Sequence, residues 1–204
     1  MRTKYKPWAL PFLKEHPDLA FPAFKKDKFF NSSLEIEIGG GKGDFIISQA
    51  LKHPKVHYLM IERVISVAGP AVKKIIENNI ENVRVIYDNF INVSHALKKE
   101  SINKIYLNFS DPWPKKKHAK RRLTSPLFME DYYRILKKDG LIVFKTDQKD
   151  LYEYTKLVLN KEKFLIVLDN PNYNKLDKDD SLTEYEAKFR KEKKTIYRLI
   201  IKKI

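Results

Sequence analysis

Two short segments of the chain carry residue types that could do chemistry: a glycine-rich loop, and an acidic turn followed by a basic run. The loop reads Glu37-Ile38-Gly39-Gly40-Gly41-Lys42-Gly43-Asp44. Its glycines let the backbone turn tightly and approach a ligand closely. The loop alone does not specify one ligand, because similar loops occur in many nucleotide-binding proteins.

The acids at the two ends of the loop narrow the choice of ligand. The dinucleotide fingerprint G-x-G-x-x-G is broken, because Asp44 stands at the third glycine position. Glu37 and Asp44 would both repel a pyrophosphate at a helix N-terminus. S-adenosylmethionine suits the loop better, since it has an ammonium group, a sulfonium and no phosphate. We therefore predict that Gly39 and Gly41 belong to a cofactor-binding loop.

A further acid, Glu62, closes the apolar run Val56 to Ile61 and lies 19 residues beyond Gly43. A carboxylate at this position of a nucleotide-binding fold can accept both ribose hydroxyls. The alternative is an ordinary strand-end acid paired with Arg63. The glycine loop upstream favours the ribose contact.

Asp88 and Asn89 follow the next apolar run along the chain. Either side chain could hydrogen-bond the amino group of an adenine. An Asx turn that caps the following helix explains the same two residues equally well. The residues alone leave both interpretations open.

The acidic turn is Asp111-Pro112-Trp113-Pro114, and the basic run 115–122 follows it directly. The prolines restrict the backbone, so that Asp111 and Trp113 project rigidly. The indole could stack on a nucleic-acid base, or it could pack within its own loop. Six of the eight residues in the run are Lys or Arg. We interpret the run as a phosphate-binding patch, with a solvated charged loop as the alternative.

The composition supports a polyanionic partner. The formal net charge of +15 exceeds what solubility needs and points to nucleic acid or an anionic membrane surface. No apolar run approaches the roughly 18 residues that span a bilayer, and no segment has the pattern of a basic amphipathic surface helix. We therefore expect nucleic acid as the partner and no membrane.

The residues do not support thiol, disulfide or metal chemistry. Cysteine is absent, which excludes disulfides, a thiolate nucleophile and Cys-ligated zinc, and suits a reducing cytoplasm. The N-terminal residues lack the apolar core of a secretory signal, so we expect a cytoplasmic protein. We expect no metal, because the histidines lack metal-ligand spacing. They are His16, His53, His57, His95 and His118.

The elements that must position these residues alternate along the chain. The predicted strands are Leu34 to Ile38, Val56 to Ile61, Val83 to Tyr87, Ile105 to Phe109, Leu141 to Lys145, Phe164 to Leu168 and Ile196 to Ile201. The predicted helices are one from about Asp44, Ile65 to Asn78, Ile91 to Lys99, Pro126 to Lys137 and Leu151 to Asn160. Such alternation requires right-handed crossovers and a mostly parallel sheet covered on both faces.

We therefore predict an α/β fold: a doubly wound, mostly parallel seven-stranded sheet with an antiparallel edge pair at the C-terminus. Ligands in such sheets bind beyond the carboxyl ends of the strands, which is where the acids described above lie. Residues 1–31 are rich in Pro, Lys and aromatic residues and show no helical or strand period. We expect them to form an extended N-terminal arm before a single domain of residues 32–204.

The string NFSDPWPKKKHAKRR, residues 108–122, with EIGGGKG upstream and TEYE downstream, resembles the bacterial tRNA (guanine-N7)-methyltransferase family. The resemblance covers the chain from about Leu34 to its C-terminus. It implies a Rossmann-like, class I S-adenosylmethionine-dependent methyltransferase. It further implies methyl transfer to N7 of a guanine in the variable loop of tRNA, which forms 7-methylguanosine.

The resemblance also implies roles for single residues. By position, the residues that contact S-adenosylmethionine are Glu37, Glu62, Asn89 and Asp111, and Asp111 is also the active-site residue. The substrate-binding positions are Lys115, Asp147, Thr183, Glu184, Tyr185 and Glu186. Family members commonly have Asp where Asn89 stands, so Asp88 could take over the adenine contact. For Asp147, the N-cap of the following helix is an alternative role.

The chemistry of the implied reaction agrees with these residues. Guanine N7 carries an in-plane lone pair that is unprotonated at neutral pH, so it can attack a sulfonium methyl directly without a general base. Positioning and electrostatics should then carry the catalysis. Methylation leaves a positive charge on the purine. A desolvated carboxylate such as Asp111 or Asp147 would stabilise this charge or orient the base through its N–H donors.

Two other functions remain open from the residues. One is an S-adenosylmethionine enzyme that modifies an exocyclic amine in nucleic acid, since its motif at the same strand end also couples an acid or amide to prolines. The other is a non-catalytic RNA-binding protein that kept a degenerate cofactor fold, although Glu37, Glu62 and Asp111 are intact. The sequence leaves open whether the protein is a monomer or a homodimer, and which tRNAs it accepts.

Overall fold

The computed structural model describes residues 4–25, 28–31 and 33–204. In this part of the chain, eight strands form one sheet in the order β1-β4-β3-β2-β5-β6-β8-β7. The strands are β1 (Ala20–Phe21), β2 (Leu34–Ile38), β3 (His57–Ile61), β4 (Val83–Ile86), β5 (Ile102–Asn108), β6 (Leu136–Thr146), β7 (Phe164–Asn170) and β8 (Tyr197–Lys203). The β8 strand pairs antiparallel with β6 and β7, and the other pairs are parallel. The predicted doubly wound sheet with an antiparallel C-terminal edge is confirmed.

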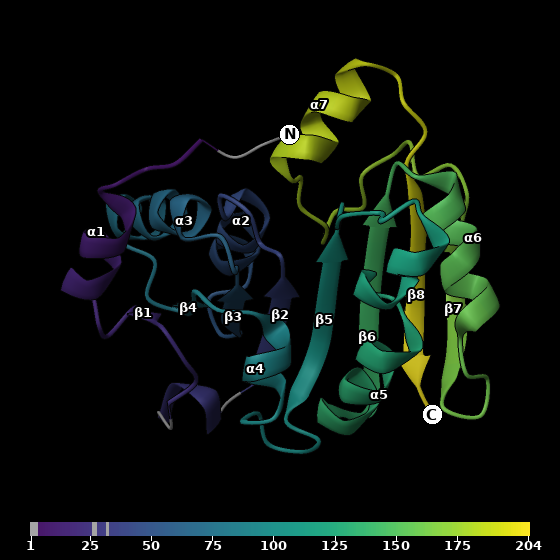
Figure 1. Cartoon of the computed structure of the whole chain (residues 1–204), viewed down its shortest axis with the longest axis horizontal. Coiled ribbons are helices and arrows are strands. Elements are labelled where there is room, and N and C mark those ends of the chain that lie inside the picture. The colour runs from purple at the N-terminus through teal and green to yellow at the C-terminus, as the bar shows by residue number, and fades with distance from the viewer. Residues whose placement is uncertain (1–3, 26–27, 32) are drawn as a thin grey trace.

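Helices cover both faces of the sheet (Figure 1). They are α1 (Ala9–Glu15), α2 (Asp44–Lys52), α3 (Ile65–Glu77), α4 (Phe90–Ser94), α5 (Pro126–Ile135), α6 (Lys149–Val158) and α7 (Glu184–Lys191), with 3-10 turns η1 (Lys28–Asn31) and η2 (Lys116–Arg121). One hydrophobic core joins the sheet to α4, α5 and α6, and a second joins its other face to α1, α2 and α3. None of the helices in the described ranges is both long and apolar enough to cross a membrane.

The N-terminal segment differs from the extended arm that we predicted. Helix α1 packs on α3, where Gly69 leaves room for Ala9; a Cβ added at Gly69 would lie 2.8 Å from the Cβ of Ala9. Strand β1 then pairs with β4 and becomes the eighth strand of the sheet, one more than predicted. Burial against the sheet thus orders a segment that lacks a clear period. Residues 1–3, 26 and 27 of the expected arm lie outside the described residues.

Strands β2 and β5 are neighbours in the middle of the sheet. From β2 the chain adds β3 and β4 on one side, and it then returns to add β5 and β6 on the other side, so the switch point lies between β2 and β5. In β2 the isoleucines face one core, whereas Glu35 and Glu37 face the side of the sheet covered by α2. A crevice at such a switch point is the usual ligand site of an open α/β sheet. Helix α7 lies beyond the carboxyl ends of β5 and β6 (Figure 1). The fold therefore brings the glycine loop, the acidic turn and α7 to one end of the sheet.

Candidate active site

The glycine-rich loop connects β2 to α2 and has the backbone that its glycines predict. Gly39 and Gly41 adopt φ angles of +75° and +60°, which L side chains rarely adopt. A Cβ built on either glycine would meet no atom within 4 Å. The loop thus presents bare backbone to open space, and a ligand can approach it closely.

Glu37 lies near the carboxyl end of β2, at the switch point of the sheet, and is 2% exposed. Its Oε1 accepts a hydrogen bond of 2.9 Å from Nδ2 of Asn108. Its Oε2 is buried without a hydrogen-bond partner, as are Oδ1 of Asn108 and Oγ of Ser110. Burial raises the pKa of Glu37 to about 8. Buried polar atoms are normally hydrogen-bonded, so these acceptors suit a ligand that brings N–H donors and positive charge.

Glu62 ends β3 beside the loop and is 8% exposed. Its Oε2 accepts from the amide of Gly41 at 3.1 Å, and its Oε1 accepts from the amide of Val64 at 2.8 Å. Burial raises the pKa of this carboxyl as well. Arg63, which we considered as a partner of Glu62, forms its ion pair with Asp111 instead. Glu62 therefore joins the glycine loop to the end of β3.

Asp88 and Asn89 occupy the start of α4 after β4. Oδ1 of Asn89 accepts from the amide of Ile91 at 3.3 Å and caps the helix. The carboxylate of Asp88 accepts from the amide of Asn89 at 2.6 Å and from Nδ2 of Asn92 at 3.0 Å. The capping interpretation is therefore realised in the structure. An adenine contact by either residue stays a prediction.

The acidic turn follows β5 and carries Asp111 on the surface. The Asp111 side chain is 71% exposed and forms an ion pair with Nη2 of Arg63 at 3.7 Å. The structure thus differs from the desolvated carboxylate that we expected, because the Asp111 side chain is open to solvent among the described residues. Phe109 and Trp113, on either side of Asp111, both have positive φ, at 50° and 43°. Left-handed backbone at bulky residues is strained, and such strain concentrates at functional sites.

Trp113 packs against the basic run rather than standing free. Its ring meets His118 edge-on at 5.6 Å between centroids, and the guanidinium of Arg121 lies 4.9 Å from its centroid. Its carbonyl oxygen accepts from Arg122, at 3.3 Å from Nε and 3.1 Å from Nη2. The packing alternative for Trp113 is realised. Base stacking would use whatever ring surface this packing leaves exposed.

The basic run divides into surface residues and one interior residue. Its lysines and Arg121 are exposed along η2, as a phosphate-binding patch requires. Arg122 is 9% exposed and lies with its guanidinium 4.2 Å from the ring centroid of Tyr154. We therefore remove Arg122 from the predicted patch, because its donors point into the protein. The exposed basic segment is therefore residues 115–121.

A buried ionic network anchors α7 to the end of β6, and our sequence analysis did not predict it. Lys145 has no exposed surface, and its Nζ donates to Asp180 at 3.0 Å and to Glu186 at 2.7 Å. Arg190 donates to the other oxygen of Glu186 at 2.7 Å, and Tyr173 donates to Asp180 at 2.8 Å. The signal in the sequence was a lysine that directly follows the apolar run 141–144.

This network divides residues 183–186, which are four of the six residues that we assigned to substrate. Glu186 is fully buried with both oxygens occupied, so it holds α7 in place and has no surface for a substrate. Thr183 caps α7 by accepting from the amide of Glu186 at 2.9 Å. Glu184 and Tyr185 are exposed, and Glu184 pairs with Lys42 of the glycine loop at 2.7 Å. Only part of this segment is therefore available to a substrate.

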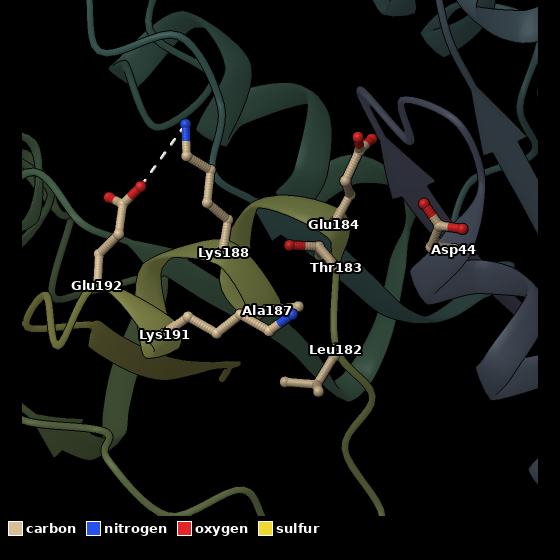
Figure 2. Close-up of a pocket in the computed structure, with 8 residues that line it drawn as sticks. All are labelled: Asp44, Leu182, Thr183, Glu184, Ala187, Lys188, Lys191 and Glu192. Atoms are coloured by element: carbon tan, nitrogen blue, oxygen red, sulfur yellow. Dashed lines mark ion pairs between the residues drawn. The ribbon is translucent and has the colours of Figure 1, made fainter.

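A groove of about 610 Å³ runs between α7 and the start of α2 (Figure 2). Its lining residues are Asp44, Leu182, Thr183, Glu184, Ala187, Lys188, Lys191 and Glu192. Figure 2 shows Asp44 across from α7, and Lys188 paired with Glu192. The groove borders the glycine loop but does not contain Glu37 or Asp111.

Asp147 follows β6 and is half-buried. Its Oδ2 accepts from Nε2 of Gln148 at 2.6 Å. The N-cap of α6 is Gln148, and no side chain caps that helix. The alternative role of Asp147 as an N-cap is thus not realised, and a substrate contact stays a prediction. Within the described residues, no cluster of three or more His, Asp or Glu side chains is arranged to hold a metal ion.

Comparison with known proteins connects this geometry to a protein family. Residues 31–199 match the family model described as "Putative methyltransferase". A tRNA (guanine-N(7)-)-methyltransferase of Staphylococcus haemolyticus is 41% identical over 206 residues, covering 98% of this chain and 96% of that protein. A protein of the same name from Listeria welshimeri is 40% identical over 207 residues, covering 98% and 97%.

Solved structures agree on the fold. An rRNA methylase from Streptococcus thermophilus superposes with a TM-score of 0.58 at 14% identity, covering 89% of this chain and 99% of that chain. A 30S ribosomal A1408 methyltransferase from an uncultured bacterium gives 0.62 at 15% identity, covering 91% and 98%. At these identities the likeness concerns the fold, and it confirms the predicted Rossmann-like methyltransferase architecture.

Proposed function

The chain belongs to the tRNA (guanine-N(7)-)-methyltransferase family, and from this premise we propose that it methylates N7 of a guanine in the variable loop of tRNA. The methyl donor that we propose is S-adenosylmethionine. One observation carries the proposal: two buried acids, Glu37 and Glu62, an exposed acidic turn and a basic segment lie at the carboxyl end of one sheet. The buried acids suit a cationic cofactor, and the basic segment suits a polyanion.

The residues at the switch point match the chemistry of the cofactor. Glu37 Oε2 and Asn108 Oδ1 are buried acceptors without partners, and they suit an ammonium group. Gly39 and Gly41 leave open backbone near them. Glu62, at the end of β3, would accept the ribose hydroxyls. Asp88 or Asn89 would contact the adenine. When bound, S-adenosylmethionine supplies a methyl group made electrophilic by its sulfonium.

The protein's task in this reaction is to position the guanine. N7 attacks through its own lone pair, so no residue has to remove a proton. The new N–C bond forms as the S–C bond breaks, and the positive charge moves from sulfur to the purine. Asp111 would orient the base through its N–H donors and stabilise that charge, and Asp147 would assist from the end of β6. Asp111 is open to solvent in the protein alone. Bound tRNA would cover Asp111 and exclude water, which would strengthen both its hydrogen bonds to the base and its stabilisation of the charge.

The remaining contacts would hold the tRNA backbone. Lys115 begins the basic segment directly after the acidic turn. Thr183, Glu184 and Tyr185 lie at the start of α7, where Glu184 pairs with Lys42 of the glycine loop. Phosphates would bind the lysines, and the half-exposed ring of Tyr185 offers a stacking surface. A tRNA substrate and a chain without cysteine together point to action in the cytoplasm.

A labelling experiment tests the function directly. The purified protein is incubated with methyl-labelled S-adenosylmethionine and unmodified tRNA, and the tRNA is digested to nucleosides. We expect the label in 7-methylguanosine. Label in a base methylated on an exocyclic amine would replace the proposed reaction with the nearest alternative. Absence of label with retained tRNA binding would indicate a non-catalytic RNA-binding protein.

A further inference from the structure

Arg122 directly follows the basic segment, and its buried guanidinium binds the backbone of the acidic turn. Nε donates to the carbonyl of Pro112 at 3.1 Å, and Nη2 donates to the carbonyl of Trp113 at 3.1 Å. These carbonyls belong to the two residues that directly follow Asp111. Arg122 is 9% exposed, whereas its neighbour Arg121 is exposed.

The backbone held by Arg122 is strained. Trp113 has a φ of 43°, and it stands between two prolines that cannot adjust their own φ. A bulky residue keeps a left-handed conformation only when its surroundings impose it. Two successive carbonyls bound by one planar guanidinium provide such a constraint, because the fork of donors has a fixed geometry.

The guanidinium is itself held in place. The ring of Tyr154, on α6, lies 4.2 Å from its central carbon and supports it through a cation–π contact. Within the described parts of the chain, Arg122 forms no ion pair, so its buried charge is balanced by carbonyl dipoles and an aromatic face. A cation without a carboxylate partner is costly to bury. Burial of Arg122 beside the acidic turn is therefore better explained by a role in function than by a contribution to folding stability.

We propose that Arg122 is a positioning residue of the methyl transfer: it fixes the turn so that Asp111 points toward the target base. This inference rests on the proposed function and deepens it. Arg121 and Arg122 are adjacent in the sequence but have different roles in this proposal: Arg121 is exposed and would bind a phosphate of the tRNA, whereas Arg122 is buried and binds the turn. We expect lysine to replace Arg122 poorly, because an ammonium lacks the planar fork of donors that fits both carbonyls and the flat face that stacks on the ring of Tyr154.

The test compares Arg122→Lys with a matched control, Arg134→Lys. Arg134 on α5 also donates to two backbone carbonyls, those of Leu97 and Ser94, but it lies at the opposite end of the sheet. We expect Arg122→Lys to lower kcat at least tenfold while KM for tRNA changes less than twofold. Arg134→Lys should keep both values near those of the wild type. Arg121→Ala should raise KM for tRNA instead.

Fluorescence reports the turn independently of activity. The chain has two tryptophans, Trp8 and Trp113, so a Trp8→Phe background leaves Trp113 as the only one. In that background we expect Arg122→Lys to increase acrylamide quenching of Trp113, and Arg134→Lys to leave it unchanged. If Arg122→Lys does not fold, Tyr154→Leu and Tyr154→Phe provide the same comparison. Removal of the ring in Tyr154→Leu should lower kcat and raise quenching more than Tyr154→Phe does.

The outcomes separate this inference from the proposed function. A folded Arg122→Lys variant with normal kcat would overturn the positioning role, and so would a rise in KM for tRNA alone, which indicates a phosphate contact. If the wild-type protein forms no 7-methylguanosine, the proposed function fails. The quenching measurement then still decides whether Arg122 holds the turn.

Discussion

Asn108 donates a hydrogen bond of 2.9 Å to Glu37, which joins the ends of β5 and β2 at the switch point of the sheet. Each residue keeps one buried oxygen without a partner. This end of the sheet therefore holds an acid whose charged form is disfavoured by burial. A cationic ligand would offset this cost when it binds.

The first prediction concerns Glu37 and the pH dependence of stability without cofactor. Burial raises the pKa of Glu37 from 4.5 to about 8, so the folded protein keeps a proton that the unfolded chain loses. Its contribution to stability is complete below pH 4.5 and is lost as the pH rises through 8. Glu37→Gln should therefore become more stable relative to wild type between pH 5 and 8, by up to about 1.4 kcal/mol per pH unit.

Urea unfolding at pH 5.5, 7 and 8.5 measures this difference. Glu35→Gln controls for the removal of an acid from β2. Glu35 already has partners in Tyr106 and Lys104, so this variant should be less stable than wild type throughout the range. Parallel pH profiles for wild type and Glu37→Gln would contradict the prediction.

The second prediction concerns the buried network under α7. Lys145→Met should lower the free energy of unfolding by roughly 3–5 kcal/mol, because it leaves Asp180 without a cation in the interior. Lys73→Met is the matched control, since it breaks an exposed pair with Glu77 and should cost about 1 kcal/mol or less. Chemical denaturation measures both. Equal effects of the two variants would show that the network contributes little.

The third prediction concerns Asp111. Asp111→Ala should lower kcat on the order of 10²-fold or more, because the guanine is then without its orienting and charge-stabilising carboxylate. The Kd for tRNA should change little, since the phosphates are bound elsewhere. Asp18→Ala, an exposed acid before β1, is the control and should behave as wild type. Single-turnover assays and filter binding measure the two quantities, and near-normal turnover would remove Asp111 from the mechanism.

The fourth prediction concerns the basic segment. The double variant Lys116→Ala/Lys117→Ala should weaken tRNA binding and reduce the slope of log K against log salt by about 2, one for each phosphate that the variant no longer binds. Lys137→Ala/Lys138→Ala is the control, an exposed lysine pair at the amino end of β6, away from the site. Binding titrations between low and moderate salt measure the slope. A slope unchanged by the first pair would place the phosphates elsewhere.

Local patterns predicted most elements correctly but missed α1 and β1 in the N-terminal segment and α7 between the last two strands. The apolar runs of the strands and the helix starts at Asp44, Ile65 and Pro126 are visible in the sequence, because burial on a sheet imposes a period. Helix α1 was missed because Pro11 lies within its sequence. Proline is tolerated there, since the first turn of a helix needs no amide donor. Packing of Leu13 into the core supplies the stability that the local pattern lacks.

The sequence by itself determined the chemistry available at the end of the sheet: the acids and glycines after the strands, and the acidic turn with its basic run. It could not determine which of these side chains face solvent. Arg121 and Arg122 are the same type of residue, and so are Glu184 and Glu186. In each pair the first is exposed and the second is buried. Only the tertiary structure decided this, because burial depends on contacts with Tyr154 and Lys145, which are distant in the chain.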